Sequence, residues 1–307
     1  GSYADVIRAI GFVIDNKDKY DIRVLNLSLS APVRSYYWDD PLNQAVMAAW
    51  QAGIVVVASA GNSGPGAMSI GVPGNNPYVI TVGATSDAYS SDYAGDDFLA
   101  EFSASGPTYE GFVKPDVVAP GGHILGLMHS DASLAAQHSQ YQDGAGWFMM
   151  SGTSQAAAIV SGIAVLMIQE EPGLTPNDVK CRLMTSAKPA VNSAGELAVS
   201  VFQQGAGFVD AYWAVHSTGM GCANRGLDID ADIAGISHFG GFANQDENGN
   251  YYIQGLEGNG YLWSDGYLWS DGYLWSDGYL WSDGYLWSDG YLWSDGNIRS
   301  NVWVGQE

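Results

Sequence analysis

The sequence predicts an α/β fold in which helices cover both faces of a mostly parallel sheet. Two runs, 54–60 and 78–84, are almost entirely apolar, which is typical of central strands buried on both faces. Segments with apolar residues at helical spacing separate such runs, and this alternation indicates parallel strands joined through helices. The chain has 307 residues and is 47% hydrophobic, enough for one large domain with an appendage.

The predicted order begins with an amphipathic helix over residues 4–19, where apolar side chains recur at helical spacing with charges between them. Residues 22–30 then alternate branched or leucine side chains with small polar ones, which predicts a strand. A second helix is expected over 43–52, and Gly53 ends it before the buried strand at 54–60.

The strands and helices after residue 60 are predicted from the same two patterns, apolar runs and helical spacing. Val117 and Val118 form a short apolar run before a turn at 120–122. Pro176 suits the first turn of a helix, where its missing N–H would have no partner in any case. The remaining predicted elements are strands at 78–84 and 117–118 and helices at 153–170 and 175–184.

The charge excludes some classes of partner. With 33 acidic against 11 basic residues, the net charge is −22, so nucleic acid and anionic membrane surfaces are repelled. The acidity leaves room for structural Ca²⁺, although a solvated acidic surface explains it equally; no cofactor is required. The longest apolar stretch, 156–168, is shorter than the roughly 20 residues of a membrane span. We therefore expect no membrane span and no nucleic-acid partner.

Cys181 and Cys222 lie 41 positions apart, without the paired spacing of a zinc site. The favoured interpretation is a single disulfide in an exported protein, secreted or held at the cell surface. Two inert buried thiols are the alternative.

One serine has the setting of a nucleophile. Ser154 falls in the first turn of a predicted helix, after Gly152 and Thr153 and before small residues. This position exposes a hydroxyl in the field of the helix N-terminus and lets a neighbouring backbone approach. Taken alone, the same pattern describes an ordinary Ser or Thr helix cap.

Several segments together resemble the subtilases, the subtilisin-like serine peptidases. The run Gly152-Thr153-Ser154-Gln155-Ala156-Ala157 is similar to the nucleophile motif of this family, and Ala60-Gly61-Asn62 is similar to its oxyanion motif. The segments 24–30, 102–107 and 114–121 extend the resemblance over about residues 1–190. The resemblance implies a subtilisin-like fold and a serine endopeptidase acting on polypeptides, with Ser154 as nucleophile and Asn62 in the oxyanion hole.

The resemblance also implies where substrate lies. Residues Ser28, Leu29 and Ser30 would line the cleft and pair with substrate backbone by β-augmentation. The residues Ala58, Ser59 and Ala60 would form the opposite pocket wall. Small residues on this wall leave room for a large apolar substrate side chain.

The sequence departs from the family in its triad. Subtilases carry their catalytic residues in the order Asp, His, Ser, and both earlier members precede the strand that 24–30 resembles. Only about twenty residues precede it here, and they hold neither Asp-x-Gly nor His-Gly-Thr-His, the motifs around the catalytic Asp and His of the family. The five histidines, all after Asn62, are expected to be surface or loop residues. We expect the Asp and His to come from an N-terminal portion of the same gene, cleaved into a separate chain or outside this sequence. A degenerate subtilase that serves as a scaffold, or a sequence cut short, are the alternatives.

The C-terminal quarter of the chain differs in composition. Residues 227–307 hold 13 acids and one base, and Tyr-Leu-Trp-Ser-Asp-Gly occurs six times without a mismatch from Tyr261 to Gly296. Such repeats could stack as strands, pair between subunits, bind sugars or form an acidic tail, so self-association or anchoring in a structural protein is the alternative function. The predicted divisions are 1–219, a partial catalytic domain; 220–260, an acidic extension; 261–296, the repeats; and 297–307, a tail.

Overall fold

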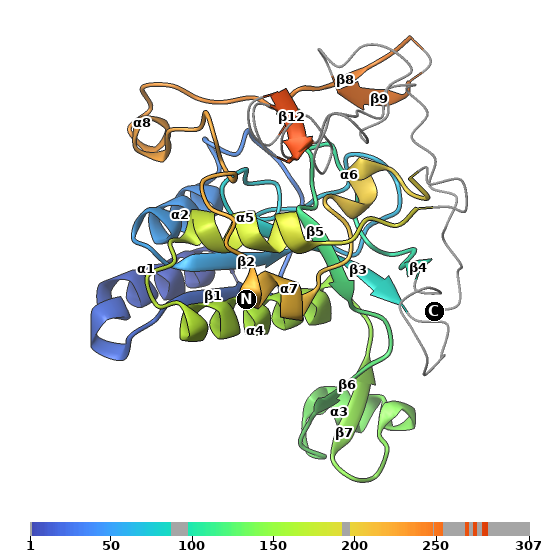
Figure 1. Cartoon of the computed structure of the whole chain (residues 1–307). Helices are drawn as coiled ribbons and strands as arrows, with labels where there is room; N and C mark the ends of the chain where they lie inside the picture. The colour runs from blue at the N-terminus through green and yellow to red at the C-terminus, as the bar shows by residue number, and fades with distance from the viewer. Residues whose placement is uncertain are drawn as a thin grey trace.

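The computed structural model describes residues 2–86, 98–191, 197–247 and 249–253, together with three short strands in the repeats. It confirms the α/β class (Figure 1). The strands of the main sheet are β1 (Val24–Leu27), β2 (Val55–Ser59), β3 (Ile80–Ser86), β4 (Phe98–Leu99) and β5 (Val117–Pro120). Strands β1, β2, β3 and β5 pair in parallel, and β4 joins the end of β3 antiparallel. The sheet is therefore mostly parallel, as predicted.

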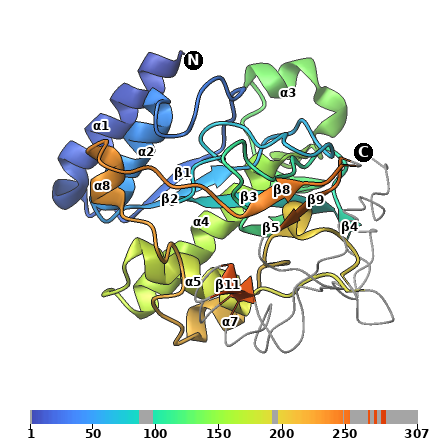
Figure 2. The ribbon, with the colours of Figure 1, turned by 90° about the horizontal axis from the view of Figure 1, so that it is seen from above.

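Helices cover both faces of this sheet. Figure 2 shows α1 (Tyr3–Tyr20) and α2 (Pro41–Gln51) on one side and α4 (Thr153–Glu170), α5 (Pro176–Ser186) and α7 (Ala211–His216) on the other. Helix α4 crosses β1, β2, β3 and β5. Among the described residues it is the one helix long and apolar enough for a membrane span, but half of that window is buried, as in a core helix.

Local sequence explains where the helices begin. Ser2 and Asp5 form a capping box at α1, and Thr175 and Asp178 form another at α5. The carboxylate of Asp40 accepts hydrogen bonds from the first N–H groups of α2. These caps satisfy backbone donors that have no partner inside a helix.

Between β5 and α4 lies a hairpin module that was not predicted from the sequence. It contains β6 (Ile124–Leu127), α3 (Ser133–Gln137), the short 3₁₀ helix Ser139–Tyr141 and β7 (Trp147–Met150), and it projects from the body (Figure 1). Its second strand leads directly into α4, so the module borders the first turn of that helix.

The chain after α5 packs back onto the domain. It forms α6 (Val201–Gln204), α8 (Ile229–Ile233), β8 (Ala243–Gln245) and β9 (Tyr251–Ile253). The predicted disulfide between Cys181 and Cys222 is present, with a Cα–Cα distance of 5.3 Å. Strands β10 (Leu268–Trp269), β11 (Tyr273–Leu274) and β12 (Gly278–Trp281) form a small parallel sheet. Most of the repeats and the tail 297–307 lie outside the described residues, so their predicted roles stay predictions.

Candidate active site

A cleft of about 590 Å³ lies where β1 and β2 end and α4 begins. Polar groups collect at this edge because the carboxyl ends of parallel strands meet there, which is where α/β folds place their sites. Its walls come from four stretches of the chain: 28–33, Ser59 with 61–63, 68–71 and 153–154. The cleft therefore joins the residues predicted for chemistry with residues predicted for substrate binding.

Ser154 stands in the first turn of α4 and lines the cleft. Its hydroxyl donates to the carbonyl oxygen of Ser28 at 3.2 Å, and the Ser28 hydroxyl donates to the carbonyl oxygen of Ser154 at 2.7 Å. The Ser154 N–H belongs to the helix end, where N–H groups have no partner inside the helix. It is therefore placed to donate to a ligand in the cleft.

Asn62 lies directly across from this turn. Its Oδ1 accepts a hydrogen bond of 2.9 Å from the Thr153 N–H and one of 2.8 Å from the Thr153 hydroxyl. The Thr153 hydroxyl also accepts from the Gly61 N–H at 3.2 Å. These bonds fix the oxygen end of the amide, so the NH₂ end is the part of Asn62 that can serve a ligand. The structure thus brings Asn62 and Ser154 together at one cleft, as predicted.

The predicted substrate-binding residues divide into two groups. Ser28, Leu29, Ser30 and Ser59 line the cleft. Ala58 and Ala60 are fully buried and do not line it. Of residues 58–60, Ser59 therefore lies at the cleft, because successive strand residues point to opposite faces of a sheet. The predicted substrate-binding roles stay predictions.

None of the five histidines lines the cleft. His129 and His138 are exposed on the hairpin module, and His123 contacts Ser86 at 3.3 Å. The Nδ1 atoms of the other two are occupied elsewhere: His216 contacts the carbonyl of Tyr212 and His238 contacts Asp232.

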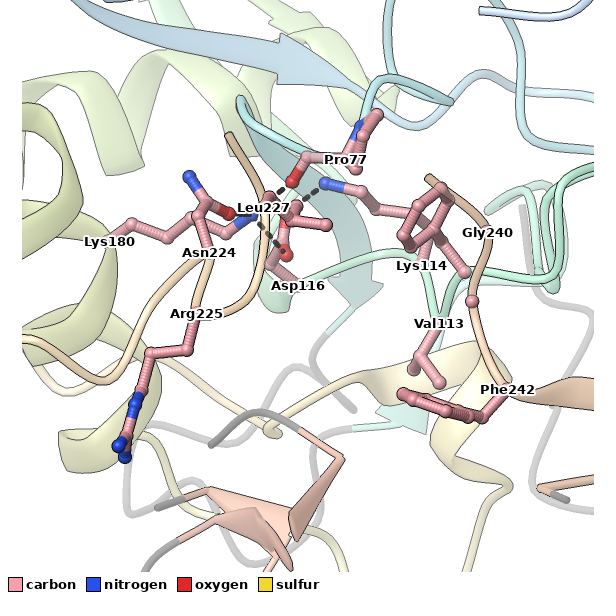
Figure 3. Close-up of a pocket in the computed structure, with 12 residues that line it drawn as sticks. Pro77, Val113, Lys114, Asp116, Lys180, Asn224, Arg225, Leu227, Gly240 and Phe242 are labelled. Carbon is pink, nitrogen blue, oxygen red and sulfur yellow. Dashed lines mark hydrogen bonds and ion pairs between the residues drawn. The ribbon is translucent and has the colours of Figure 1, made fainter. Parts of the chain in front are cut away.

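A second, smaller cavity of about 90 Å³ contains an ion cluster (Figure 3). The ammonium groups of Lys114 and Lys180 approach the Asp116 carboxylate from two sides, at 2.6 and 3.1 Å. All three side chains are almost fully buried. Burial lowers the pKa of Lys114 to about 7, a shift that Asp116 partly opposes, and burial also lowers the pKa of Lys180.

The cluster has a structural role. Lys180 of α5 donates to the carbonyl oxygens of Pro77 and Val79, and Lys114 also donates to Val79. The Asp116 carboxylate accepts from the Thr81 N–H. Through these hydrogen bonds the cluster links α5 and the segment before β5 to the start of β3.

In the described part of the chain, no three His, Cys, Asp or Glu side chains converge on one point. Structural calcium accordingly stays a prediction without an assigned site.

Two contributors to the cleft were not predicted from the sequence. Thr153, which orients Asn62, is recognisable from the sequence only as part of the serine motif. The segment 68–71 forms one side of the cleft, yet nothing in its composition separates it from an ordinary loop. The usable signal for Thr153 was its place beside a helix N-terminus, where hydroxyls commonly bond to nearby loops.

Comparison with known families agrees with this geometry. A sequence model of the family described as the Subtilase family matches residues 1–207. The chain is similar to the serine protease AprX of Bacillus subtilis (strain 168), with 42% identity over 185 residues, 59% of this chain and 42% of that protein. It is also similar to subtilisin DY of Bacillus licheniformis, with 31% identity over 189 residues, 61% of this chain and 56% of that protein. The chain thus spans less than two thirds of the length of these curated relatives.

Two proteases of known structure also superpose on this chain. The prenylagaramide maturation protease PagA superposes with a TM-score of 0.51 at 26% identity, covering 70% of this chain and 67% of PagA. The S41 psychrophilic protease superposes with a TM-score of 0.54 at 25% identity, covering 68% of this chain and 64% of that protein.

Proposed function

Because the chain belongs to the subtilase family of serine proteases, we propose that it supplies the nucleophile and oxyanion hole of a serine endopeptidase. The catalytic Asp and His come from an N-terminal portion outside these 307 residues, either continuous with the chain or held against it as a separate fragment. The observation that carries this proposal is the pairing of Ser154 with Asn62 across one cleft.

In the proposed reaction, Ser154 Oγ attacks a peptide carbonyl while the His imidazole takes its proton. The Asn62 NH₂ and the Ser154 N–H donate to the oxygen that becomes negative in the tetrahedral intermediate. The proton then passes from the imidazole to the leaving amine, and water hydrolyses the acyl-enzyme by the same route. Residues Ser28, Leu29 and Ser30 bind the substrate backbone as an added strand.

Two features support a missing portion that packs beside β1. In the described part of the sheet, β1 pairs with β2 alone, so its other edge has unpaired backbone groups. Val165 and Leu166 on the outer side of α4 are each 51% exposed, although α4 is a core helix. A further strand and helix from the Asp- and His-bearing portion would cover both features. The Ser154 hydroxyl would then exchange its bond to Ser28 for one to the imidazole.

We also propose that the protein is exported. The Cys181–Cys222 disulfide supports it, because disulfides persist in oxidising compartments.

The proposed function is tested by peptide hydrolysis with protein expressed from the complete coding sequence. We expect Ser154→Ala to abolish cleavage of a casein or fluorogenic peptide substrate. The matched control is Ser151→Ala, three residues earlier and outside the cleft lining, which should retain activity. Equal activity in wild type and Ser154→Ala would refute the assignment.

The structural alternative rests on the six identical hexapeptides. Aromatic strands of identical sequence favour ordered pairing, so the protein could assemble through them. Filaments seen by electron microscopy that persist in Ser154→Ala and vanish when residues 261–296 are deleted would support this alternative.

A further inference from the structure

The Ser30 side chain lies at a place in the cleft where two glycines leave room for it. A Cβ added at Gly71 would lie 2.0 Å from Ser30 Oγ, and a Cβ added at Gly61 would lie 2.9 Å from the same atom. Gly61, Gly71 and Ser30 all line the cleft that contains Ser154. The Ser30 hydroxyl therefore fills the space between the two glycine backbones.

Neighbouring hydrogen bonds hold this arrangement in place. The backbones of Ala31 and Val72 bond reciprocally, at 2.9 and 2.8 Å. The Ser59 hydroxyl donates to the Leu29 carbonyl at 3.0 Å. Because the residues on both sides of Ser30 are bonded to neighbouring walls of the cleft, these bonds fix the backbone position from which its side chain extends.

The proposed reaction fixes where the substrate side chain must go. The scissile carbonyl carbon lies against Ser154 Oγ, and its oxygen lies near the NH₂ of Asn62. The preceding substrate residue runs along 28–30, so its side chain enters the slot between the segments 28–31 and 59–62. The segment 68–71 closes this slot on a third side. Ser30 Oγ is located inside the slot, between Gly61 and Gly71.

We propose that Ser30 is a specificity-determining residue that restricts the substrate residue before the scissile bond to a small side chain, such as Ala, Ser or Gly. This inference rests on the proposed function. The sequence alone favours a large apolar substrate side chain, because the residues of the pocket wall are small. The Ser30 hydroxyl, which lies between Gly61 and Gly71, is the reason for proposing a small side chain instead.

The test uses two fluorogenic hexapeptides that differ only in Ala or Phe before the cleaved bond. With full-length protein, we expect a higher kcat/KM for the Ala peptide. Ser30→Gly should raise the Phe-to-Ala ratio of kcat/KM by about tenfold or more, the scale of one extra group in an enzyme pocket. Ser30→Ala, which keeps Cβ and removes Oγ, should give an intermediate ratio. The control Ser130→Gly, on the exposed hairpin module, should not change the ratio.

A second readout separates this inference from the proposed function. Ser154→Ala protein, with Ser30 or with Ser30→Gly, is titrated with labelled versions of both peptides, and binding is followed by fluorescence anisotropy. A Phe-to-Ala affinity ratio that rises with Ser30→Gly supports the inference even if wild type cleaves neither peptide. Cleavage with an unchanged ratio in Ser30→Gly overturns the inference and leaves the protease assignment standing. Absence of both cleavage and binding overturns both.

Discussion

Thr153 uses two hydrogen bonds to hold the carbonyl oxygen of the Asn62 side chain. A neutral amide held in this way is pre-organised, because its NH₂ needs no reorientation when negative charge develops on a substrate oxygen. The exposed Asn62 and the N-terminus of α4 together direct partial positive charge into the cleft. At the residue scale, the geometry therefore suits stabilisation of an oxyanion.

Replacement of Asn62 tests this role. Asn62→Ala should lower kcat by about 10²- to 10³-fold with little change in KM, because the lost donor acts mainly on the transition state. The comparison is Asn244→Ala on the exposed strand β8, with wild-type kinetics expected. A rise in KM at constant kcat would instead indicate that Asn62 contributes to ground-state binding.

We expect the buried Lys114 to make the free energy of unfolding depend on pH. Its pKa is lowered from the usual 10.5 to about 7 by burial, so between these values the unfolded chain binds more protons than the folded chain. The free energy of unfolding contributed by this group therefore rises from pH 7 to pH 10.5 and is flat below pH 7.

Lys114→Met should lack this rise. Denaturant titrations at pH 7.5 and pH 10 should show that the stability difference between wild type and Lys114→Met shifts in favour of wild type at pH 10. The exposed Lys19→Met is the control and should follow the wild-type pH profile. Parallel profiles for wild type and Lys114→Met would contradict the lowered pKa of Lys114.

At the scale of elements, the bounds of helices and strands were predicted most accurately from the sequence where the residues are most completely buried. The helix Thr153–Glu170 has the predicted bounds, and β2 lies within the predicted run 54–60 because every residue in it is buried. The first strand is shorter than predicted, Val24–Leu27 instead of 22–30, since residues 28–30 leave the sheet to line the cleft. The alternation of apolar and small polar residues cannot reveal where a strand stops pairing.

The hairpin module could not be predicted from local sequence patterns either. Strands β6 and β7 pair across a gap of some 20 residues, so neither carries a local turn signal. Its apolar face includes Leu127, which is 77% exposed, and side chains with this exposure give no burial pattern to read. The cleft segment 68–71 was missed for a similar reason, because loop positions are set by tertiary contacts.

The disulfide joins α5 to the segment that follows α7. Cys181 and Cys222 are 41 positions apart, and cross-linking a loop of this length stabilises a fold by about 4 kcal/mol in the chain-entropy model. The double variant Cys181→Ser, Cys222→Ser should therefore lose stability on this scale in chemical denaturation. A loss below about 1 kcal/mol would mean that the packing of α5 alone holds the two segments.

At the scale of the whole molecule, the segment after the family match is anchored to the domain through Asp232. Its buried carboxylate accepts hydrogen bonds from the hydroxyls of Tyr37 at 2.6 Å and Tyr78 at 3.0 Å, and it contacts His238 at 2.7 Å. Burial and the nearby carboxylate raise the pKa of both tyrosines above the usual range. The acidic composition of the C-terminal quarter could not reveal this contact, and the division predicted at residue 220 stays a prediction.

Asp232→Ala should destabilise the entire domain. Two buried tyrosine hydroxyls would lose their acceptor, at a cost of about 1 to 3 kcal/mol each. Denaturation followed by tryptophan fluorescence should show one transition at lower denaturant, while the exposed Glu247→Ala should leave the midpoint unchanged. A new, separate transition at low denaturant would show that the segment unfolds independently of the sheet.

The central claim is that Ser154 becomes an activated nucleophile when an Asp- and His-bearing portion completes the fold. The most direct measurement is intact mass spectrometry of the natively isolated protein before and after a fluorophosphonate probe that labels activated serines. We predict that additional upstream polypeptide, continuous with this chain or co-purifying as a second one, is present, and that a single adduct maps to Ser154. An isolated 307-residue chain that stays unlabelled would contradict the claim.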